Sequence, residues 1–233
     1  MNKNVVIIPT YNEVDNIGNL IKKIIDLNLS LDILVVDDNS PDGTGRAAEN
    51  LARECPEVKV IHCRKKNGLG VAYSTGFKKA FEEGYEYIIC MDGDLSHNPQ
   101  YIPQFLDKIA GCDLVLGSRF LNGIHIINWS FFRLCLSLSA IQYVRLVTGM
   151  PFSDPLGGFR CFRRKTLESI AKDGFVSKGY IFQAETLYKI YRKGYKILEI
   201  PITFIDRTIG KSKLSLSIIL EALFKIFILR FKA

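Results

Sequence analysis

The chain has 233 residues, of which 48% are hydrophobic, so it can bury a full core as one large α/β domain or two small ones. Its net charge of +7 attracts phosphates, anionic lipid or nucleic acid, but the sequence lacks the dense Lys/Arg run with interleaved aromatics that would favour nucleic acid. The six cysteines are scattered without a C-x-x-C pair or histidines at zinc spacing, which favours buried free thiols in a reducing compartment.

The first half of the chain alternates short apolar runs with amphipathic stretches, beginning with a strand at the N-terminus, where no signal peptide is expected. This alternation predicts an α/β fold with a mostly parallel sheet whose faces are covered by helices. Strands are expected at residues 4–9, 31–36, 58–62, 88–91 and 113–117. Helices are expected from Asn12 to about Leu27 and at about 45–54, 71–83 and 99–110.

Two carboxylates, Asp92 and Asp94, directly follow the apolar run 88–91. Alternation along an extended chain points both to the same side at the carboxyl end of a strand, where open α/β sheets bind ligands. Two negative charges held this close favour a cation, and oxygen ligands favour Mg²⁺ or Mn²⁺ with water and substrate phosphates completing its shell. An isolated Asp-Gly-Asp also fits a solvated turn, because the motif is too short to be specific.

Acidic residues also follow two other predicted strands, as Glu13 and as the pair Asp37 and Asp38. Asp37 fits either a ligand role or a support for Asp38, and Asp42 fits turn chemistry. A loop at 206–213 packs three cations into a short stretch. Acids that hold a metal, opposed by arginine and lysine, are what a diphosphate leaving group requires, so a nucleotide diphosphate is the expected ligand.

The second half of the chain is less regular. Residues 129–148 predict an amphipathic or partly buried helix, in which recurring charges disfavour a membrane span. A turn and short strand at 157–163, a helix at 182–192 and a strand at 196–204 follow, and Pro201 places this last strand near an edge of the sheet. Residues 214–231 are very apolar and predict an amphipathic helix that lies on a bilayer or docks on another protein. The expected division is a catalytic domain at 1–213 and this helix at 214–233.

Several short motifs together resemble the family 2 glycosyltransferases of GT-A (Rossmann-like) fold. They are Pro9-Thr10-Tyr11-Asn12-Glu13, Val35-Val36-Asp37-Asp38-Asn39-Ser40, Met91-Asp92-Gly93-Asp94 and Gly117-Ser118-Arg119. Later stretches, around Gly157-Gly158-Phe159-Arg160, Ser177 to Gln183 and Glu199 to Leu214, are similar to the dolichyl-phosphate (polyprenyl-phosphate) mannose synthases in their short form, without C-terminal transmembrane helices. The resemblance implies inverting, metal-dependent transfer of mannose from GDP-mannose to a polyprenyl (dolichyl) phosphate, with Mg²⁺ or Mn²⁺ as cofactor.

The resemblance also implies a role for each residue that matches the family's motifs. The nucleotide base and ribose would be bound by Pro9, Tyr11, Glu13, Val36 and Asp38. The metal and diphosphate would be held by Asp92 and Asp94, with Ser96 as a third contact where some relatives have the better ligand glutamine. Arg207 and Lys213 would clamp the donor phosphates, and Arg119 and Arg133 would receive the phosphate of the acceptor. Asp94 and Arg119 are the expected catalytic residues.

No general base is assigned, because a phosphate acceptor is already anionic near neutral pH. His97 is therefore expected to be a loop residue near the metal, and His62 and His125 to be structural. The expected partners are GDP-mannose, a polyprenyl phosphate, a membrane surface on its cytoplasmic face and a small membrane anchor subunit. The alternatives are a related transferase using UDP-glucose or another sugar nucleotide, a nucleotide-sugar-binding regulatory subunit without turnover, and a hydrolase with two flanking carboxylates.

Overall fold

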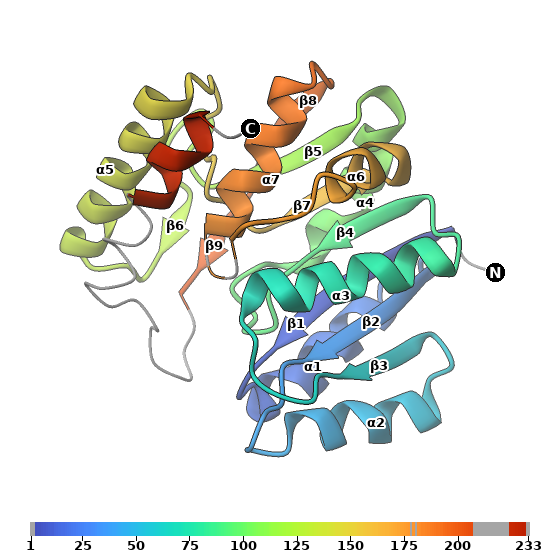
Figure 1. Cartoon of the computed structure of the whole chain (residues 1–233). Helices are drawn as coiled ribbons and strands as arrows, with labels where there is room; N and C mark the ends of the chain where they lie inside the picture. The colour runs from blue at the N-terminus through green and yellow to red at the C-terminus, as the bar shows by residue number, and fades with distance from the viewer. Residues whose placement is uncertain (1–2, 178, 180, 207–223, 232–233) are drawn as a thin grey trace.

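The computed structural model describes residues 3–177, 179, 181–206 and 224–231. Its centre is a seven-stranded sheet in the order β3-β2-β1-β4-β7-β5-β8, and a two-stranded sheet of β6 and β9 lies beside it (Figure 1). The strands are β1 (Asn4–Thr10), β2 (Leu31–Asp37), β3 (Val58–His62), β4 (Tyr87–Cys90), β5 (Leu114–Ser118), β6 (Ile126–Ile127), β7 (Arg160–Arg163), β8 (Ile197–Pro201) and β9 (Phe204–Ile205).

Helices cover both faces of the seven-stranded sheet (Figure 1). The α-helices are α1 (Val14–Ile25), α2 (Thr44–Glu54), α3 (Leu69–Glu82), α4 (Ile102–Lys108), α5 (Phe131–Thr148), α6 (Arg164–Ala171) and α7 (Ile181–Arg192). Short 3₁₀ turns, η1 (Pro99–Tyr101) and η2 (Ile109–Gly111), flank α4, and residues 224–231 are also helical.

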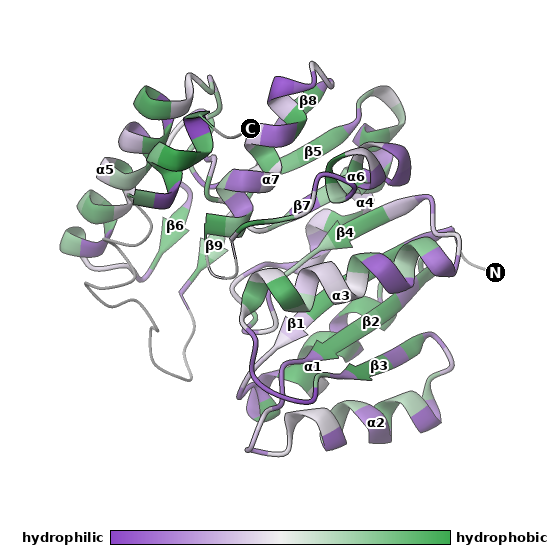
Figure 2. Ribbon diagram, viewed as in Figure 1, coloured by the Kyte–Doolittle hydropathy of each residue, from purple (hydrophilic) through white to green (hydrophobic). Residues whose placement is uncertain are grey.

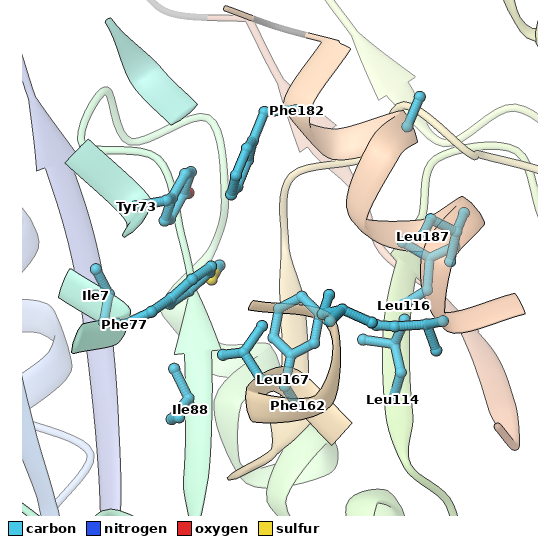
Figure 3. Close-up of a cluster of buried hydrophobic side chains, with 14 of the residues drawn as sticks. Ile7, Tyr73, Phe77, Ile88, Leu114, Leu116, Phe162, Leu167, Phe182 and Leu187 are labelled. Atoms are coloured by element: carbon cyan, nitrogen blue, oxygen red, sulfur yellow. The ribbon is translucent and has the colours of Figure 1, made fainter. Parts of the chain in front are cut away.

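Alternation along the strands divides the core between the two faces. On β1, Val5 and Ile7 pack with α3, α6 and α7, whereas Val6 and Ile8 pack with α1, α2 and α4. Figure 3 shows the first of these clusters, in which aromatic rings from α3 and α7 meet. A strand that is apolar on both faces is typical of a sheet covered by helices, as the sequence predicts.

The chain direction reverses once within the large sheet. The strand β7 runs antiparallel to both of its neighbours, β4 and β5, while the other pairings of this sheet are parallel. The strands β1, β2, β4, β5 and β8 therefore all end at one edge of the sheet, and β7 begins there. Every loop that follows a parallel strand and carries a candidate site residue lies at this edge.

The predicted elements are confirmed, with two differences. The predicted strand 196–204 is two strands, because β8 ends at Pro201, which has no N–H to donate, and the chain then pairs as β9 with β6. β8 is one of the two edge strands of the large sheet, as Pro201 indicates. The predicted helix 99–110 is α-helical only over α4, with 3₁₀ turns at both ends.

The helix α5 is partly buried, as the sequence predicts. By length and apolar composition alone, it is also long enough to cross a membrane. Ile141, Val144 and Thr148 face the protein body, while most of the remaining surface is exposed or half-buried. The helix at 224–231 contacts the end of α5, where Arg230 donates to the Thr148 carbonyl oxygen. Of the predicted C-terminal helix, residues 214–223 lie outside the described residues.

Candidate active site

The loop after β4 orients two carboxylates at the sheet edge. The Asp94 carboxylate accepts hydrogen bonds from the Ser96 backbone N–H at 3.1 Å and from the Ser96 hydroxyl at 2.5 Å. The Asp92 backbone N–H donates to Nδ1 of His97 at 3.1 Å, and the buried His97 ring stacks on Phe159. These contacts fix the turn, so His97 is a loop residue next to the acids, as the sequence indicates.

The donor set at this loop fits a hard divalent cation. Among the described residues, no group of three or more His, Cys, Asp or Glu side chains is placed to enclose a metal. Two carboxylates alone suit Mg²⁺ or Mn²⁺, which take most of their ligands from substrate phosphates and water. Ser96 is buried behind Asp94, and its hydroxyl contacts the Asp94 carboxylate. A metal contact by Ser96 stays a prediction, whereas its support of Asp94 is a direct observation.

The loops after β1 and β2 are held together by buried acids. The Asp38 carboxylate accepts from the backbone N–H groups of Asn67 and Gly68, both at 2.8 Å. The Asp37 carboxylate accepts from the hydroxyls of Thr10 and Ser40. Asp37 therefore ties the end of β2 to Thr10 and Ser40, and Asp38 anchors the turn that begins α3. Whether Asp37 also binds the ligand or supports Asp38 stays a prediction.

The other residues predicted to bind the nucleotide lie at the same edge. Pro9 and Val36 are opposite each other in the β1–β2 ladder, one residue before the two strands end. Glu13 begins α1, where its backbone N–H donates to the Thr44 hydroxyl at 2.9 Å. The ring of Tyr11 lies under the ammonium of Lys66, 3.7 Å from its centroid. We call Glu13, Asp37, Asp38, Asp92 and Asp94 the carboxylate side of the site.

On the other side of the site, arginines are held by acids. Arg119 follows β5, and its Nε and Nη2 atoms donate to the two carboxylate oxygens of Asp154 at 2.6 and 2.8 Å. Asp154 is fully buried, and although burial lowers the pKa of Arg119, this carboxylate raises it above its ordinary value. Arg119 is therefore a fixed cation whose guanidinium is already bound along one edge.

Arg133, near the start of α5, donates to Asp206 at 2.5 Å. Its guanidinium lies 4.3 Å from the ring centroid of Trp129, and that of Arg119 lies 5.5 Å from the same ring. The two arginines predicted to bind the acceptor phosphate thus pair with different acids, but both guanidinium groups lie against the ring of Trp129. We call Arg119, Arg133 and their partners Asp154 and Asp206 the arginine side of the site.

Sequence reasoning missed two buried groups that hold the chain around α7. Arg160 is buried and donates to the carbonyl oxygens of Pro155, Gly157 and Gln183, which ties the loop before β7 to α7. Glu185 is buried and accepts from the backbone N–H groups of Val176 and Ser177. Asp154 was missed as well. Its only sequence signal is its place in the run Ser153-Asp154-Pro155, just before Gly157-Gly158, which reads as an ordinary turn.

The structure therefore brings the expected residues of both sides to one edge. The exceptions are Arg207 and Lys213, the predicted clamps on the donor phosphates, which lie outside the described residues. Their roles, like those of the other site residues, stay predictions.

Comparison with known proteins agrees with this arrangement. Residues 5–171 match the glycosyl transferase family 2. The chain is 42% identical to the undecaprenyl-phosphate mannosyltransferase of Micrococcus luteus, over 93% of this chain and 89% of the relative. It is also 42% identical to the polyprenol monophosphomannose synthase of Mycolicibacterium smegmatis, over 96% of this chain and 85% of the relative.

Solved structures show the same fold at lower identity. The mannosyltransferase PcManGT of Pyrobaculum calidifontis, in complex with GDP-Man and Mn²⁺, superposes with a TM-score of 0.66 at 21% identity. The alignment covers 90% of this chain but 58% of that one. Glucosyl-3-phosphoglycerate synthase of Mycobacterium tuberculosis gives a TM-score of 0.72 at 16% identity, over 99% of this chain and 79% of that one.

The α/β fold, with carboxylates and arginines at one sheet edge, is that of a nucleotide-sugar-dependent transferase of GT-A type. The chain belongs to glycosyl transferase family 2. It is a glycosyltransferase whose relatives at 42% identity carry the names of polyprenyl-phosphate mannose synthases.

Proposed function

We propose that the protein transfers mannose from GDP-mannose to a polyprenyl phosphate. The observation that carries the proposal is the 42% identity to two mannosyltransferases of this kind, over more than nine-tenths of the chain. The site supports it, because acids suited to a metal and diphosphate face arginines suited to an acceptor phosphate. Exposed phenylalanines on α5 and on the helix at 224–231 suit an acceptor that is a lipid.

On the carboxylate side, Asp92 and Asp94 would hold a divalent cation, Mg²⁺ or Mn²⁺. When bound, such a cation neutralises charge that develops on the departing diphosphate. Ser96 keeps the Asp94 carboxylate turned toward the site, and Arg207 and Lys213 would add positive charge to the donor phosphates. Pro9, Tyr11, Glu13, Val36 and Asp38 would enclose the base and ribose.

On the arginine side, Arg119 and Arg133 would attract and orient the acceptor phosphate. An oxygen of this phosphate attacks C1 of the sugar as the bond from C1 to the GDP oxygen breaks, which inverts the configuration at C1. The attacking oxygen is already anionic, so the step needs no general base. Catalysis then rests on positioning and on charge neutralisation.

The surface beside the arginine side suits a membrane. Phe131 and Phe132, at the start of α5, are 81% and 78% exposed, and Phe224, Phe227 and Phe231 are exposed on the helix at 224–231. Figure 2 shows hydrophobic residues on both helices, which lie together at one end of the molecule. Exposed aromatic residues next to Arg133 fit an interfacial helix, so we infer peripheral attachment to the cytoplasmic face of a membrane. A small membrane anchor subunit is the other partner that would cover this face.

A transfer assay tests the proposal. Purified protein, Mg²⁺ or Mn²⁺, labelled GDP-mannose and a short polyprenyl phosphate should give organic-extractable label that disappears when a chelator is added. UDP-glucose is run in parallel. Label from UDP-glucose alone would overturn the proposed donor and leave the site assignments standing.

A further inference from the structure

The four residues of the arginine side carry no net charge, because each arginine is paired with one acid. Arg119 is paired with Asp154, and Arg133 is paired with Asp206. The proposed acceptor is a phosphate monoester, a group whose charge near neutral pH is about −1.5 to −2. A site without net charge attracts such an anion weakly, and opening either of the two ion pairs would supply the missing positive charge.

The pair of Arg119 and Asp154 is held closed by its surroundings. Two guanidinium nitrogens and the backbone N–H of Arg119 all donate to the Asp154 carboxylate, at 2.6, 2.8 and 3.1 Å. The Asp154 side chain is fully buried, and the Asp154 backbone N–H donates to the Glu199 carboxylate on β8 at 3.3 Å. Separating two charges that are buried together is costly, so this pair stays intact when an acceptor binds.

The pair of Arg133 and Asp206 is accessible to solvent. Nη1 of Arg133 donates to the Asp206 carboxylate at 2.5 Å, and the two side chains are 26% and 21% exposed. An ion pair that water reaches contributes little net free energy. A phosphate has more negative charge than a carboxylate and three strong acceptor oxygens, so it can take the place of Asp206 on the guanidinium.

Both partners of this pair are also held by contacts outside the pair. The Arg133 backbone N–H donates to the Ser130 hydroxyl at the start of α5, and the Arg133 guanidinium lies 4.3 Å from the ring centroid of Trp129. Asp206 follows β9, which pairs with β6 (Figure 1), and its backbone N–H donates to the Ile127 carbonyl oxygen at 3.0 Å. The pair can therefore open while the backbone on each side stays in place.

We propose that the Asp206 carboxylate occupies the position on Arg133 that the acceptor phosphate takes, and that the phosphate displaces it. The proposal rests on the proposed function, because it takes Arg133 to bind the acceptor. The exposed Phe131 and Phe132 directly precede Arg133 in α5, so the chain of a lipid phosphate can contact them as its phosphate displaces Asp206. An anion without a lipid chain lacks this contact and displaces Asp206 less readily.

Binding of a short, soluble polyprenyl phosphate in the absence of a donor tests this exchange. Titration calorimetry is carried out on the wild type and on Asp206→Asn, which has no carboxylate to displace. The variant should bind the phosphate about fivefold more tightly, and its KM for this acceptor in the transfer assay should fall by the same factor. Asp173→Asn is the matched control, because it removes an acid from an exposed pair with Lys193 beyond the end of α7 and should leave the affinity unchanged.

The same titration in Arg133→Met shows whether the two anions compete for Arg133. Asp206→Asn should have no further effect on affinity in this background, since the shared cation is gone. Weaker binding by Asp206→Asn alone would show that Asp206 orients Arg133, and unchanged binding would show that the phosphate does not meet this pair. Either result would overturn the proposal. A wild type that binds the polyprenyl phosphate but transfers no mannose would refute the proposed function and leave this inference standing.

Discussion

The two sides of the site use their acids differently. On the carboxylate side, Asp37, Asp38 and Asp94 accept hydrogen bonds from backbone N–H groups and hydroxyls, which are neutral. On the arginine side, Asp154 and Asp206 accept from guanidinium groups. A hydrogen bond from a neutral donor orients a carboxylate without cancelling its charge, whereas an ion pair cancels charge and fixes geometry. Removal of an acid should therefore cost activity on the first side and stability on the second.

The largest effect is expected for Asp94→Asn. The amide oxygen can still accept from Ser96, so the fold and the melting temperature should be unchanged, but the charge that faces the metal and diphosphate is lost. Transfer activity should fall about 10³-fold, the scale of a removed electrostatic contact at a reacting centre. The transfer assay and a thermal melt measure the two effects, with Asp107→Asn on the exposed surface of α4 as control. Full activity in Asp94→Asn would remove Asp94 from the site.

Asp154→Asn should show the opposite pattern. It leaves the nearly buried Arg119 guanidinium without its counterion, which should lower the free energy of unfolding by about 3 kcal/mol. Asp206→Asn breaks the more exposed pair with Arg133 and should cost less than about 1 kcal/mol. Urea unfolding of both variants tests the difference, and equal costs would contradict the contrast between the buried pair and the partly buried pair.

The buried carboxylate of Glu185 should make the stability of the protein depend on pH. Burial raises the pKa of Glu185, but hydrogen bonds from Val176, Ser177 and Lys189 lower it below its ordinary value of 4.5. Its contribution to stability is therefore present above about pH 4.5 and is lost as the pH falls through the lowered pKa. Glu185→Gln should cost about 2 kcal/mol at pH 7 and flatten the acid limb of the stability curve.

The control for this variant is Glu168→Gln, which breaks a half-buried pair with Arg164 on the surface of α6 and should change stability by less than about 0.5 kcal/mol at any pH. Urea midpoints of the wild type and both variants are measured from pH 7 down to the onset of acid unfolding. An acid limb as steep in Glu185→Gln as in the wild type would refute the role of Glu185.

The smallest effect concerns the membrane face beside the arginine side. The double variant Phe131→Glu, Phe132→Glu should reduce binding to anionic lipid vesicles about tenfold or more, because it replaces exposed apolar surface with charge. The melting temperature should not change, since both side chains are exposed. The control is Leu198→Glu on the edge strand β8, which adds a negative charge at an exposed apolar position outside α5 and should leave vesicle binding unchanged. Unchanged sedimentation with vesicles would favour a protein partner for this face.

The sequence predicts the carboxylate side better than the arginine side, for a physical reason. Asp38 and Asp94 follow apolar strands directly, so strand alternation and the shared sheet edge are enough to bring them together. The partners of Arg119 and Arg133 are 35 and 73 residues away in the chain, Asp154 in the loop before β7 and Asp206 after the two-residue strand β9. Local pattern cannot find such pairs, because they depend on the reversed strand β7 and on the contact between α5 and the loop after β9.

The same reason explains the residues that were missed. Arg160 and Gln183 come from β7 and α7, and their contact depends on how α7 packs beside the loop before β7. Gln183 lies within the stretch that resembles mannose synthases, but nothing in that stretch distinguishes a buried amide from an exposed one. The elements themselves were predictable, since their hydrophobic periods are regular.

The reversed strand β7 also brings the two ends of one segment of the chain together. The chain leaves the sheet after β5 and returns as β7 at the same edge, where the Gly117 N–H donates to the Phe159 carbonyl oxygen at 2.9 Å. Residues 119–159, which include Arg119, Arg133, α5 and Asp154, thus form an insertion whose two ends touch. Such a segment can be lengthened or exchanged without altering the register of the strands around it. Under the proposed function, it is the unit to exchange in order to change the acceptor while leaving the carboxylate side as it is.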